Sequence, residues 1–409
     1  MDLIKKNKEK IIAFLATFGV QIFQLITADR LHDINGWVGV WYGADYSIGF
    51  GSRLFMGTVL HAILGDYISA ETAKAVVILF LVIGAALIAL VIAEAIGKCR
   101  DDISKAAITF LSLIFLAGPG SIGYLWTEEN MGRLETYLLS MTLVMFFLGM
   151  RIKNDFLMIG IMSLLATMCI AIHQVWALLY FPLVFVMYVD RIWKSNFNKR
   201  VIVCSVVSCM YMIVLCVVFE LCMNMRFDDL NLMFKYIQSR SGVPMTDATL
   251  EQEYFWPFYK HYTLNYLPEA RTRARNGFIT FVLLLPMFGS YIYVWIRARK
   301  HSRSKVEKWK YTIMTLPLAT YVLVFGYLTD WGRWFAALVL VDFGIVIYLW
   351  LADDVGIKKG IEDLGRHVKQ LPILFGAIVV YLTAFEKFEG CNYVNQSLNF
   401  YHFVYNLIH

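Results

Sequence analysis

The residue types best suited to chemistry lie in one polar stretch, residues 41–57, between the first two apolar segments. It contains a carboxylate, Asp45, and a guanidinium, Arg53, among four glycines that let the backbone turn or approach a ligand closely. A carboxylate can take the proton of an attacking hydroxyl, and a guanidinium can bind a phosphate through two parallel hydrogen bonds. The alternative is an interfacial loop with aromatic side chains at headgroup level and solvated charges. The stretch is therefore a candidate catalytic loop.

Two further groups between later apolar segments could act as acids or bases. Adjacent Glu128 and Glu129 precede Arg133. Paired carboxylates suit a general base or a divalent cation, whereas the alternative is a helix start whose acids favour the positive end of the helix dipole. His173 lies where two apolar segments meet almost without a loop, and its ordinary pKa suits proton transfer near pH 7, unless it only bonds a neighbouring helix. We take Asp45, Glu128 and His173 as the catalytic candidates.

Arginines recur beside these groups and suit a negatively charged substrate. Guanidinium groups match phosphate oxygens well, although they also contact anionic groups at any membrane surface. The predicted substrate-binding residues are Arg53, Arg133, Arg271, Arg273, Arg275, Asp330 and Arg333.

The composition is that of an integral membrane protein. Of the 409 residues, 59% are hydrophobic and 17% are charged, and the mean hydropathy is +0.60, whereas soluble domains have about 25% charged residues. Long apolar runs favour helices over a barrel of short alternating strands. The net charge of +6 comes from basic residues in inter-span loops, so it gives no indication of nucleic acid binding. We expect one all-α membrane domain over residues 1–409.

The apolar runs predict about eleven transmembrane helices. The first is expected to be an uncleaved span and not a signal peptide. The seven cysteines show no spacing typical of a disulfide framework or a metal site. The expected helices cover residues 10–27, 72–97, 104–124, 134–150, 156–172, 174–189, 201–222, 277–296, 311–328, 334–351 and 370–386.

The distribution of basic residues predicts a cytoplasmic N-terminus. In that orientation 24 of the 37 Lys and Arg residues lie in cytoplasmic segments, as the positive-inside rule requires. Two long segments, 28–71 and 223–276, then lie outside, and both are expected to carry amphipathic helices. Residues 51–66 are predicted to be such a helix on the outer face, or a re-entrant one, and not a further crossing. Nearly all candidate site residues fall on this outer side.

The layout resembles the GT-C superfamily of polytopic glycosyltransferases. Those enzymes have an acidic catalytic residue in a long first outer loop, a second acidic position between the third and fourth spans, and another long outer loop after the seventh. The corresponding positions here are Asp29, Asp33 or Asp45, then Glu128 and Glu129, then residues 223–276.

The chain is also similar to exopolysaccharide polymerases of the EpsG/Wzy type. Gly43-Ala-Asp-Tyr is similar to the Gly-x-Asp-Tyr that follows their first span, and Arg133 and His173 resemble their arginine and intramembrane histidine. Gln174 departs from the aromatic residue or Glu that they often carry there. The C-terminal third aligns with neither family.

The resemblance implies glycosyl transfer at the outer face of the plasma or inner membrane, in polysaccharide biosynthesis of the cell envelope. The donor would be a sugar on a polyprenyl phosphate or diphosphate, and the acceptor a glycan or a lipid-linked glycan. The residues suit this chemistry, because arginines would neutralise the departing phosphate and a carboxylate or His173 would deprotonate the acceptor. A divalent cation is the one cofactor left open.

Two other functions remain as alternatives. A flippase or transporter of a lipid-linked glycan would need polar groups along a path open to both faces, and intramembrane Asp342 and Glu220 favour it. A membrane acyltransferase acting on a glycan could use His173 as its base. It would be expected to have a second histidine or a cytoplasmic site that binds an acyl carrier, and His301 and His367 lie in basic cytoplasmic segments without an evident partner.

Overall fold

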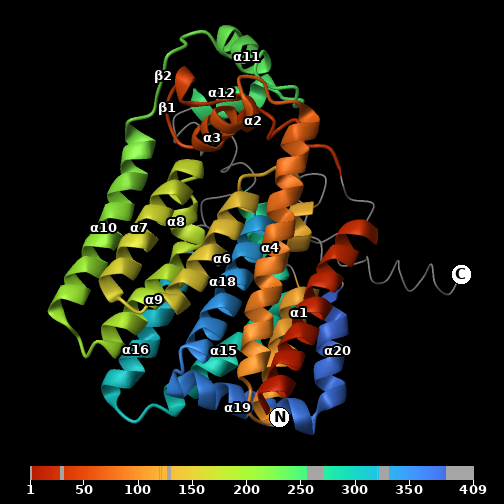
Figure 1. Ribbon diagram of the computed structural model, residues 1–409, viewed down its shortest axis with the longest axis vertical. Coiled ribbons are helices and arrows are strands. Elements are labelled where there is room, and N and C mark those ends of the chain that lie inside the picture. Colours follow the sequence, from red (N-terminus) through yellow and green to blue (C-terminus); the bar gives the residue numbers. More distant parts are fainter. Residues whose placement is uncertain are drawn as a thin grey trace, which may run out of the picture.

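Helices make up nearly all of the structure, because in a helix the backbone of a long apolar run satisfies its own hydrogen bonds. The computed structural model describes residues 2–27, 32–118, 120, 122–126, 130–255, 270–319, 321 and 331–383. The all-α class predicted from the sequence is confirmed, with one small two-stranded sheet in the described part. Figure 1 shows a bundle of long helices with a cap of short elements at the end away from the N-terminus.

The bundle helices occupy the predicted apolar ranges and run back and forth between two ends (Figure 1). Each of the eleven predicted ranges contains helix. In chain order the bundle is made of α1 (Asp2–Thr27), α4 (Ala70–Lys98), α5 (Asp102–Ala117), η2 (Ile122–Trp126), α6 (Glu135–Arg151), α7 (Asp155–Ile172), α8 (Trp176–Leu179), α9 (Phe181–Lys194), α10 (Lys199–Leu221), α14 (Ala270–Leu283), α15 (Leu285–Lys300), α16 (Lys305–Thr315), η4 (Leu316–Ala319), α18 (Trp331–Leu351) and α20 (Pro372–Thr383).

Five helical segments of the described chain are long and apolar enough to cross a membrane. They are α4, α5 continued to Leu125, α7, α10 and α18. The pair α14 and α15 would add a sixth, although its axis bends by 68°. The other segments are shorter or more polar: α20, with 12 residues, is about 18 Å long against a hydrocarbon core of about 30 Å. The predicted count of eleven crossings and the inside–outside assignment therefore stay predictions.

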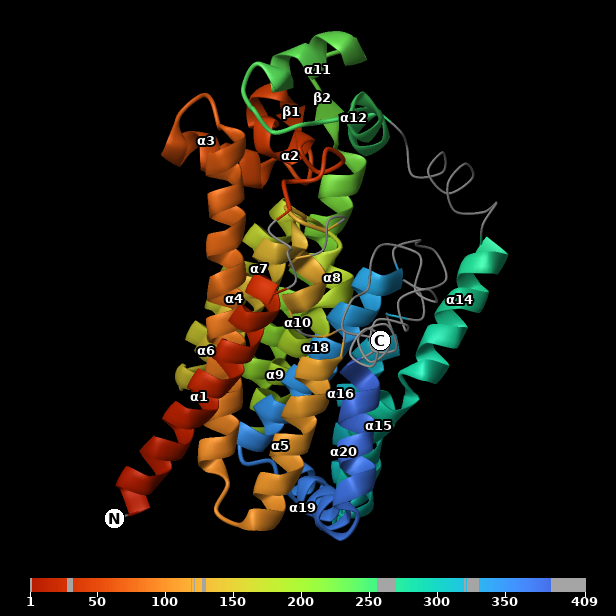
Figure 2. The ribbon, with the colours of Figure 1, turned by 90° about the vertical axis from the view of Figure 1, so that its right-hand side faces the viewer.

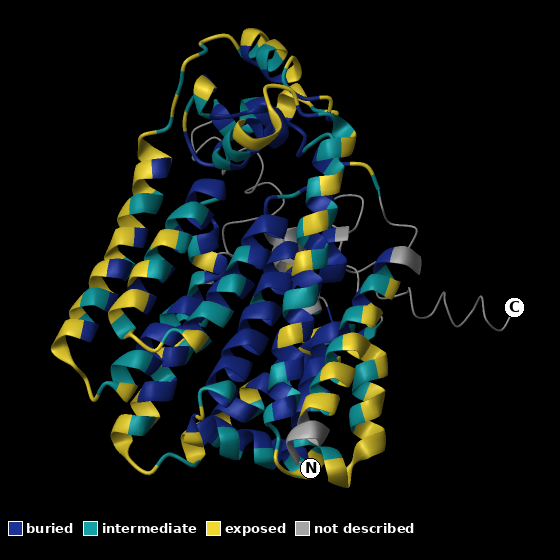
Figure 3. Cartoon of the chain, viewed as in Figure 1, coloured by how far each residue is buried: buried dark blue, intermediate teal, exposed yellow. Residues whose placement is uncertain are grey.

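The core of the bundle is built around α18, which is buried along most of its length (Figure 3). Helices such as α10 bury one side and expose the other, and the exposed side chains of α10 are mostly Val, Ile, Met and Leu. An apolar outer face is what a helix needs in contact with lipid, because lipid tails are as apolar as the protein core. The burial pattern thus agrees with a membrane environment.

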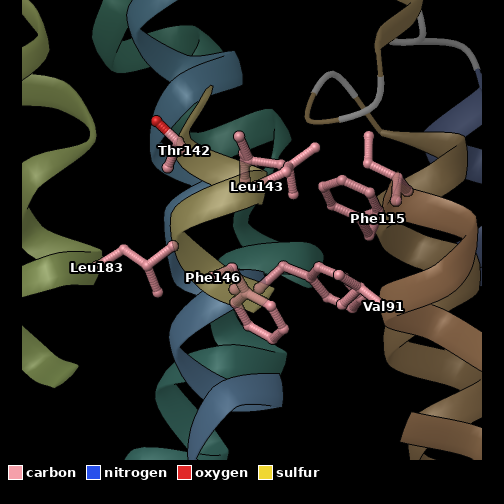
Figure 4. A pocket seen from close by; sticks show the side chains of 10 residues that line it. Val91, Phe115, Thr142, Leu143, Phe146 and Leu183 are labelled. Carbon is pink, nitrogen blue, oxygen red and sulfur yellow. The ribbon is translucent and has the colours of Figure 1, made fainter. Parts of the chain in front are cut away.

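Apolar side chains fill the middle of the bundle. Figure 4 shows the cavity there, which Phe115, Leu143, Phe146 and other apolar groups enclose and which measures about 10 Å³. This is about the minimum volume for one water molecule. The hydroxyl of Thr142 at its edge already accepts a hydrogen bond from Trp176 Nε1 at 2.9 Å. Apart from Thr142, the described side chains that line this cavity are apolar or glycine.

One amphipathic helix, α19 (Val355–Gln370), crosses the end of the bundle that holds the N-terminus (Figure 1). The basic residues of this range predict a connecting loop, whereas the structure has a helix here. Glycines allow the close packing, because a Cβ at Gly360 would lie 2.6 Å from the Val294 carbonyl oxygen and one at Gly365 would lie 2.1 Å from that of Ile103. We call this the inner end of the bundle and the opposite one the outer end.

The two long segments predicted to lie outside meet at the outer end and fold into one unit, the cap (Figure 1). The cap comprises residues 36–69 and 222–255. Helix α3, ten residues long, occupies the predicted amphipathic range 51–66 and spans only about 15 Å, too short for a crossing. The cap elements are α2 (Val40–Gly43), η1 (Tyr46–Ile48), β1 (Gly49–Phe50), α3 (Phe55–Leu64), β2 (Asn224–Met225), α11 (Leu230–Gln238) and α12 (Asp247–Tyr254).

Candidate functional site

A small apolar core and a short strand pair hold the two halves of the cap together. Antiparallel pairing joins Gly49 to Met225. Val40, Ile48 and other residues of the first half pack against Met233 and others of the second. Glycine is needed at two points of this interface: Gly49 has φ +151°, and a Cβ at Gly43 would come 2.6 Å from the Ile237 carbonyl oxygen. The glycines of residues 41–57 therefore serve the assembly of the cap.

Asp45, the first candidate base, lies inside this interface. Its carboxylate caps η1 by accepting the Ser47 N–H at 2.9 Å and the Ser47 hydroxyl. It also pairs with Arg240 Nη2 of the second half at 2.6 Å. The other guanidinium nitrogen of Arg240 donates to Ser47 Oγ and to the Tyr236 hydroxyl, each at 2.9 Å. These contacts join the two halves of the cap, and the role of Asp45 as a base stays a prediction.

Arg53 connects the cap to the bundle. Its backbone has φ 69°, a left-handed conformation that costs a non-glycine residue about 1 kcal/mol or more. A hydrogen bond holds this conformation: the backbone N–H of Arg53 donates to the carbonyl of Ala171, at the end of α7, at 3.1 Å. The side chain pairs with Glu253 of α12, and Nη2 lies 3.5 Å from His173 Nε2. The structure thus brings two predicted site residues, Arg53 and His173, into contact.

His173 ends α7 just beyond the spanning segment 155–172 and is half-buried. Its Nδ1 accepts the backbone N–H of Val175 at 3.4 Å. Burial and three nearby guanidinium groups lower its pKa, and the side chain of Gln174 offsets them in part. The imidazole is therefore neutral at pH 7. The guanidinium groups belong to Arg53, Arg333 and Arg133.

A buried ion pair closes the other side of this cluster. Arg333, in the first turn of α18, pairs through Nη1 with Glu135 Oε1 at the start of α6. Both residues are buried, and the second carboxylate oxygen of Glu135 accepts no hydrogen bond from the described residues. Residues of α6, α7, α18 and the cap therefore meet near His173 at the outer end, and among the described residues the arginines there outnumber the carboxylates. We call Arg53, Arg133, His173 and Arg333 the arginine cluster.

The other predicted residues are not in this cluster. Arg275 is exposed on α14, which leans away from the rest of the bundle in Figure 2. Glu128 and Asp330, together with Asp29 and Glu129, lie outside the described residues, as do the side chains of Arg271 and Arg273. In the described part of the chain, no group of three or more His, Cys, Asp and Glu side chains has the geometry to bind a metal ion.

The two carboxylates that favoured transport are on different helices. Asp342 is buried in α18, with Tyr291 and Tyr321 as electrostatic neighbours. Glu220 is exposed at the outer end of α10 and accepts from Gln174 Nε2 at 3.2 Å.

Sequence reasoning did not single out three charged residues that shape the site. Glu253 contacts Arg53, Glu135 contacts Arg333, and Arg240 contacts Asp45. Each partner is distant along the chain, so no local spacing indicates the pair. The one available signal is that Glu135 follows two residues after Arg133, at the start of an apolar helix.

The chain gives no match to any model of a protein family, and a search of curated proteins finds no significant match.

Proposed function

We propose that the chain is a membrane glycosyltransferase, or a polysaccharide polymerase of related chemistry, that uses a sugar on a polyprenyl phosphate or diphosphate as its donor. The observation that carries the proposal is the arginine cluster. Arg53 Nη2 lies 3.5 Å from the imidazole of His173 at the end of the bundle, under the cap, and Arg333 and Arg133 are further charged neighbours of this ring. A phosphate headgroup on a lipid tail fits such a position, because its charge is bound by arginines while its tail stays in the membrane.

The reaction requires binding of the donor, neutralisation of the charge on the departing phosphate and removal of the proton from the acceptor hydroxyl. The oxygen of the acceptor hydroxyl attacks the anomeric carbon, and the bond from that carbon to the phosphate oxygen breaks. The phosphate leaves with the electron pair, and the guanidinium groups stabilise the charge that develops on it. The hydroxyl proton passes to a carboxylate. Attack from the side opposite the phosphate inverts the anomeric configuration.

Carboxylates that could take this proton lie on both sides of the arginine cluster. Asp45 and Glu128 are the predicted carboxylate bases, and His173 is the third predicted candidate. The structure adds Glu253, which reaches Arg53 from the cap, and Glu135, which reaches Arg333 from α6.

The closed centre of the bundle favours transfer over transport. The cavity of about 10 Å³ there is lined by apolar groups, and the charged candidates that the structure brings together lie at the outer end. A flippase would need a polar route for a glycan headgroup, and such a headgroup is far larger than this cavity. The acceptor, a glycan or lipid-linked glycan, would approach from the aqueous side at the cap.

The test uses cells that lack the chain and are complemented with variants expressed at equal levels. Cell-surface glycans are analysed for composition, and lipid-linked sugars are measured by mass spectrometry. We expect R53A and R333A to lose the glycan and accumulate the lipid-linked donor. R226A is the matched control, because Arg226 is an exposed arginine of the cap outside the cluster. Full glycan synthesis by R53A and R333A would contradict the proposal.

The same cells distinguish transfer from transport. Periodate that cannot cross the membrane oxidises only sugars on the outer leaflet. If the chain is a transferase, the accumulated donor is already outside and is oxidised in intact cells. If the chain is a flippase, the donor is retained inside and is oxidised only after permeabilisation, which would overturn the proposal.

A further inference from the structure

A groove runs between α5 and α20, two helices that lie side by side near the inner end of the bundle (Figure 2). Its volume is about 440 Å³, within the range of about 300–1,000 Å³ that is usual for small-molecule sites. Phe110 of α5 and Phe375 of α20 belong to its wall and meet edge to face, with ring centroids 4.8 Å apart. The groove is thus a site separate from the arginine cluster, which lies at the outer end.

The residues that line the groove form one stripe on each helix. Residues three and four apart share one face of a helix, and the lining residues follow this spacing on both α5 and α20. The two stripes therefore face each other along about 16 Å of helix, a shape that suits a lipid acyl chain. The stripes are residues 102, 105, 106, 109 and 113 on α5 and residues 372, 375, 376 and 379 on α20.

Three polar side chains lie at successive depths along the α5 stripe. Asp102 is the first residue of the helix, Lys105 follows about one turn deeper, and Thr109 lies about one further turn toward the middle of the bundle. Within the described residues, the side chains of Asp102 and Thr109 have no hydrogen bond or ion pair. The ammonium of Lys105 pairs with Glu9 of α1 at 2.9 Å. An ammonium has three donors, so this one can bind a second acceptor.

This order of polar groups matches that of a zwitterionic phospholipid whose headgroup ends in a primary ammonium, such as phosphatidylethanolamine. From the headgroup inward, that lipid has an ammonium, a phosphate, ester carbonyls and acyl chains. The carboxylate of Asp102 can accept from the ammonium, and Lys105 can donate to the phosphate. The hydroxyl of Thr109 can donate to an ester carbonyl. Each part of the lipid then meets a side chain of complementary charge or hydrogen bonding.

The charges at the rim of the groove favour this lipid over an anionic one. Among the lining residues and their ion-pair partner, the carboxylates of Asp102 and Glu9 outnumber the single ammonium of Lys105. Phosphatidylglycerol has no cation for Asp102, and neither has a polyprenyl phosphate. Phosphatidylcholine has a cation, but its quaternary nitrogen has no N–H to donate to the carboxylate.

We propose that the groove binds phosphatidylethanolamine, with its ammonium at Asp102, its phosphate at Lys105 and one acyl chain between the two stripes. The lipid would hold α20 against α5. This helix has 12 residues and is too short to cross a hydrocarbon core of about 30 Å, so added apolar contacts stabilise its position. The site does not depend on the proposed function, and neither result decides the other.

The choice of lipid is tested on the wild-type chain. The full protein is freed of lipid in detergent and titrated with dioleoyl phosphatidylethanolamine, phosphatidylcholine or phosphatidylglycerol, and native mass spectrometry counts the bound lipids. We expect phosphatidylethanolamine to bind a few-fold more tightly than the other two, because one partly exposed ion pair contributes up to about 1 kcal/mol. Equal binding of the three lipids, or tighter binding of phosphatidylglycerol, would overturn the proposal.

A side chain at Gly376 tests whether the acyl chain lies in the groove. A Cβ at this position would meet nothing within 4 Å, so in G376F the ring can enter the groove without displacing the protein. We expect G376F to bind phosphatidylethanolamine about tenfold more weakly or worse, because the acyl chain loses its apolar contacts. I373F is the matched control, because Ile373 is exposed on α20 and does not line the groove.

The headgroup contact is tested with D102N, which should remove the preference for phosphatidylethanolamine over phosphatidylglycerol. E362Q, on α19 and outside the groove, should keep this preference. Thermal unfolding without lipid confirms that the variants are folded, and added phosphatidylethanolamine should raise the Tm of wild type and I373F more than that of G376F. Wild-type binding by G376F, or an unchanged preference in D102N, would overturn the site. A wild-type dimer that G376F abolishes would assign the groove to a second copy of the chain instead.

Discussion

Asp45 and Arg240 form an ion pair of 2.6 Å that joins the first and second halves of the cap. Both side chains are mostly buried, and each makes further hydrogen bonds within the interface. Such a pair acts as one unit, since loss of either partner leaves the other charge without compensation. We expect D45A and R240A to lower the midpoint of thermal unfolding by similar amounts, and the double variant to fall little further. Differential scanning fluorimetry in detergent measures this coupling, which should be about 1–3 kcal/mol.

The same pair distinguishes a structural from a catalytic Asp45. If Asp45 mainly holds the cap, D45N and R240A should reduce glycan synthesis to a similar extent, because both break the ion pair. If Asp45 is the base, D45N should abolish synthesis while R240A retains much of it. K235A is a suitable control for R240A. Lys235 is a basic residue of the same half of the cap, on α11 next to Tyr236, and its side chain makes no ion pair within the described residues.

Glu253 reduces the positive charge that Arg53 presents to a ligand. Neutralising this carboxylate should increase the net positive charge that Arg53 and its surroundings present to a phosphate. We therefore expect E253Q to bind farnesyl phosphate a few-fold more tightly than wild type and R53A to bind it at least about tenfold more weakly, from the loss of a charged hydrogen bond. Titration in phosphatidylcholine nanodiscs checks both. Weaker binding by E253Q would show that Glu253 instead positions Arg53.

Helix positions could be predicted well from the sequence, because long apolar runs have few alternatives in a membrane chain. The main difference is α19, whose basic residues suggested a loop. This range is an amphipathic helix capped by Asp354, and Gly360 and Gly365 allow it to pack closely against the backbone of neighbouring elements. Hydropathy alone does not show that contact, because it depends on how distant segments pack.

The site could be predicted only in part. Arg53 and His173 stood out by residue type and position, and the structure brings them together. Glu253 lies in a short polar helix without apolar periodicity, so nothing local to it indicates its pairing with Arg53. Asp45 was recognised as a carboxylate suited to chemistry, but its ion pair depends on a chain segment that joins it only after folding. Sequence patterns report local structure, whereas these roles arise from tertiary contacts.

The ion pair of Glu135 and Arg333 joins α6 to α18 in a buried position. Removing one partner of a buried pair typically costs about 3–5 kcal/mol, because the other charge remains without compensation. We expect E135A to be strongly destabilised and the double variant E135A/R333A to be less destabilised than the sum of the single variants. Thermal unfolding of the four proteins measures this. Additive effects would show that the two side chains do not depend on one another.

The topology predicts different accessibility for the cap and the inner end. With the seven native cysteines replaced, single cysteines are placed at exposed Asp228 in the cap and at exposed Arg303 between α15 and α16. A maleimide that cannot cross the membrane should label D228C in intact cells and R303C only after permeabilisation. Labelling of R303C in intact cells would reverse the predicted orientation and remove the arginine cluster from the outer face.

The lowered pKa of His173 predicts how stability depends on pH. Burial and nearby guanidinium groups lower this pKa below its ordinary value of about 6.5 in the folded state. Between the folded and unfolded pKa values the unfolded chain binds more protons, so stability falls as pH decreases through the unfolded value. We expect the Tm of wild type to fall between about pH 7.5 and pH 5.5, and that of H173Q to fall less.

The groups that face the imidazole are Arg53 with its partner Glu253, Arg133, Arg333 with its partner Glu135, and Gln174. Because the two proteins differ at this residue alone, the difference between the two curves isolates His173. Parallel curves would mean that His173 keeps its ordinary pKa, and that the arginine cluster is more hydrated than its burial indicates.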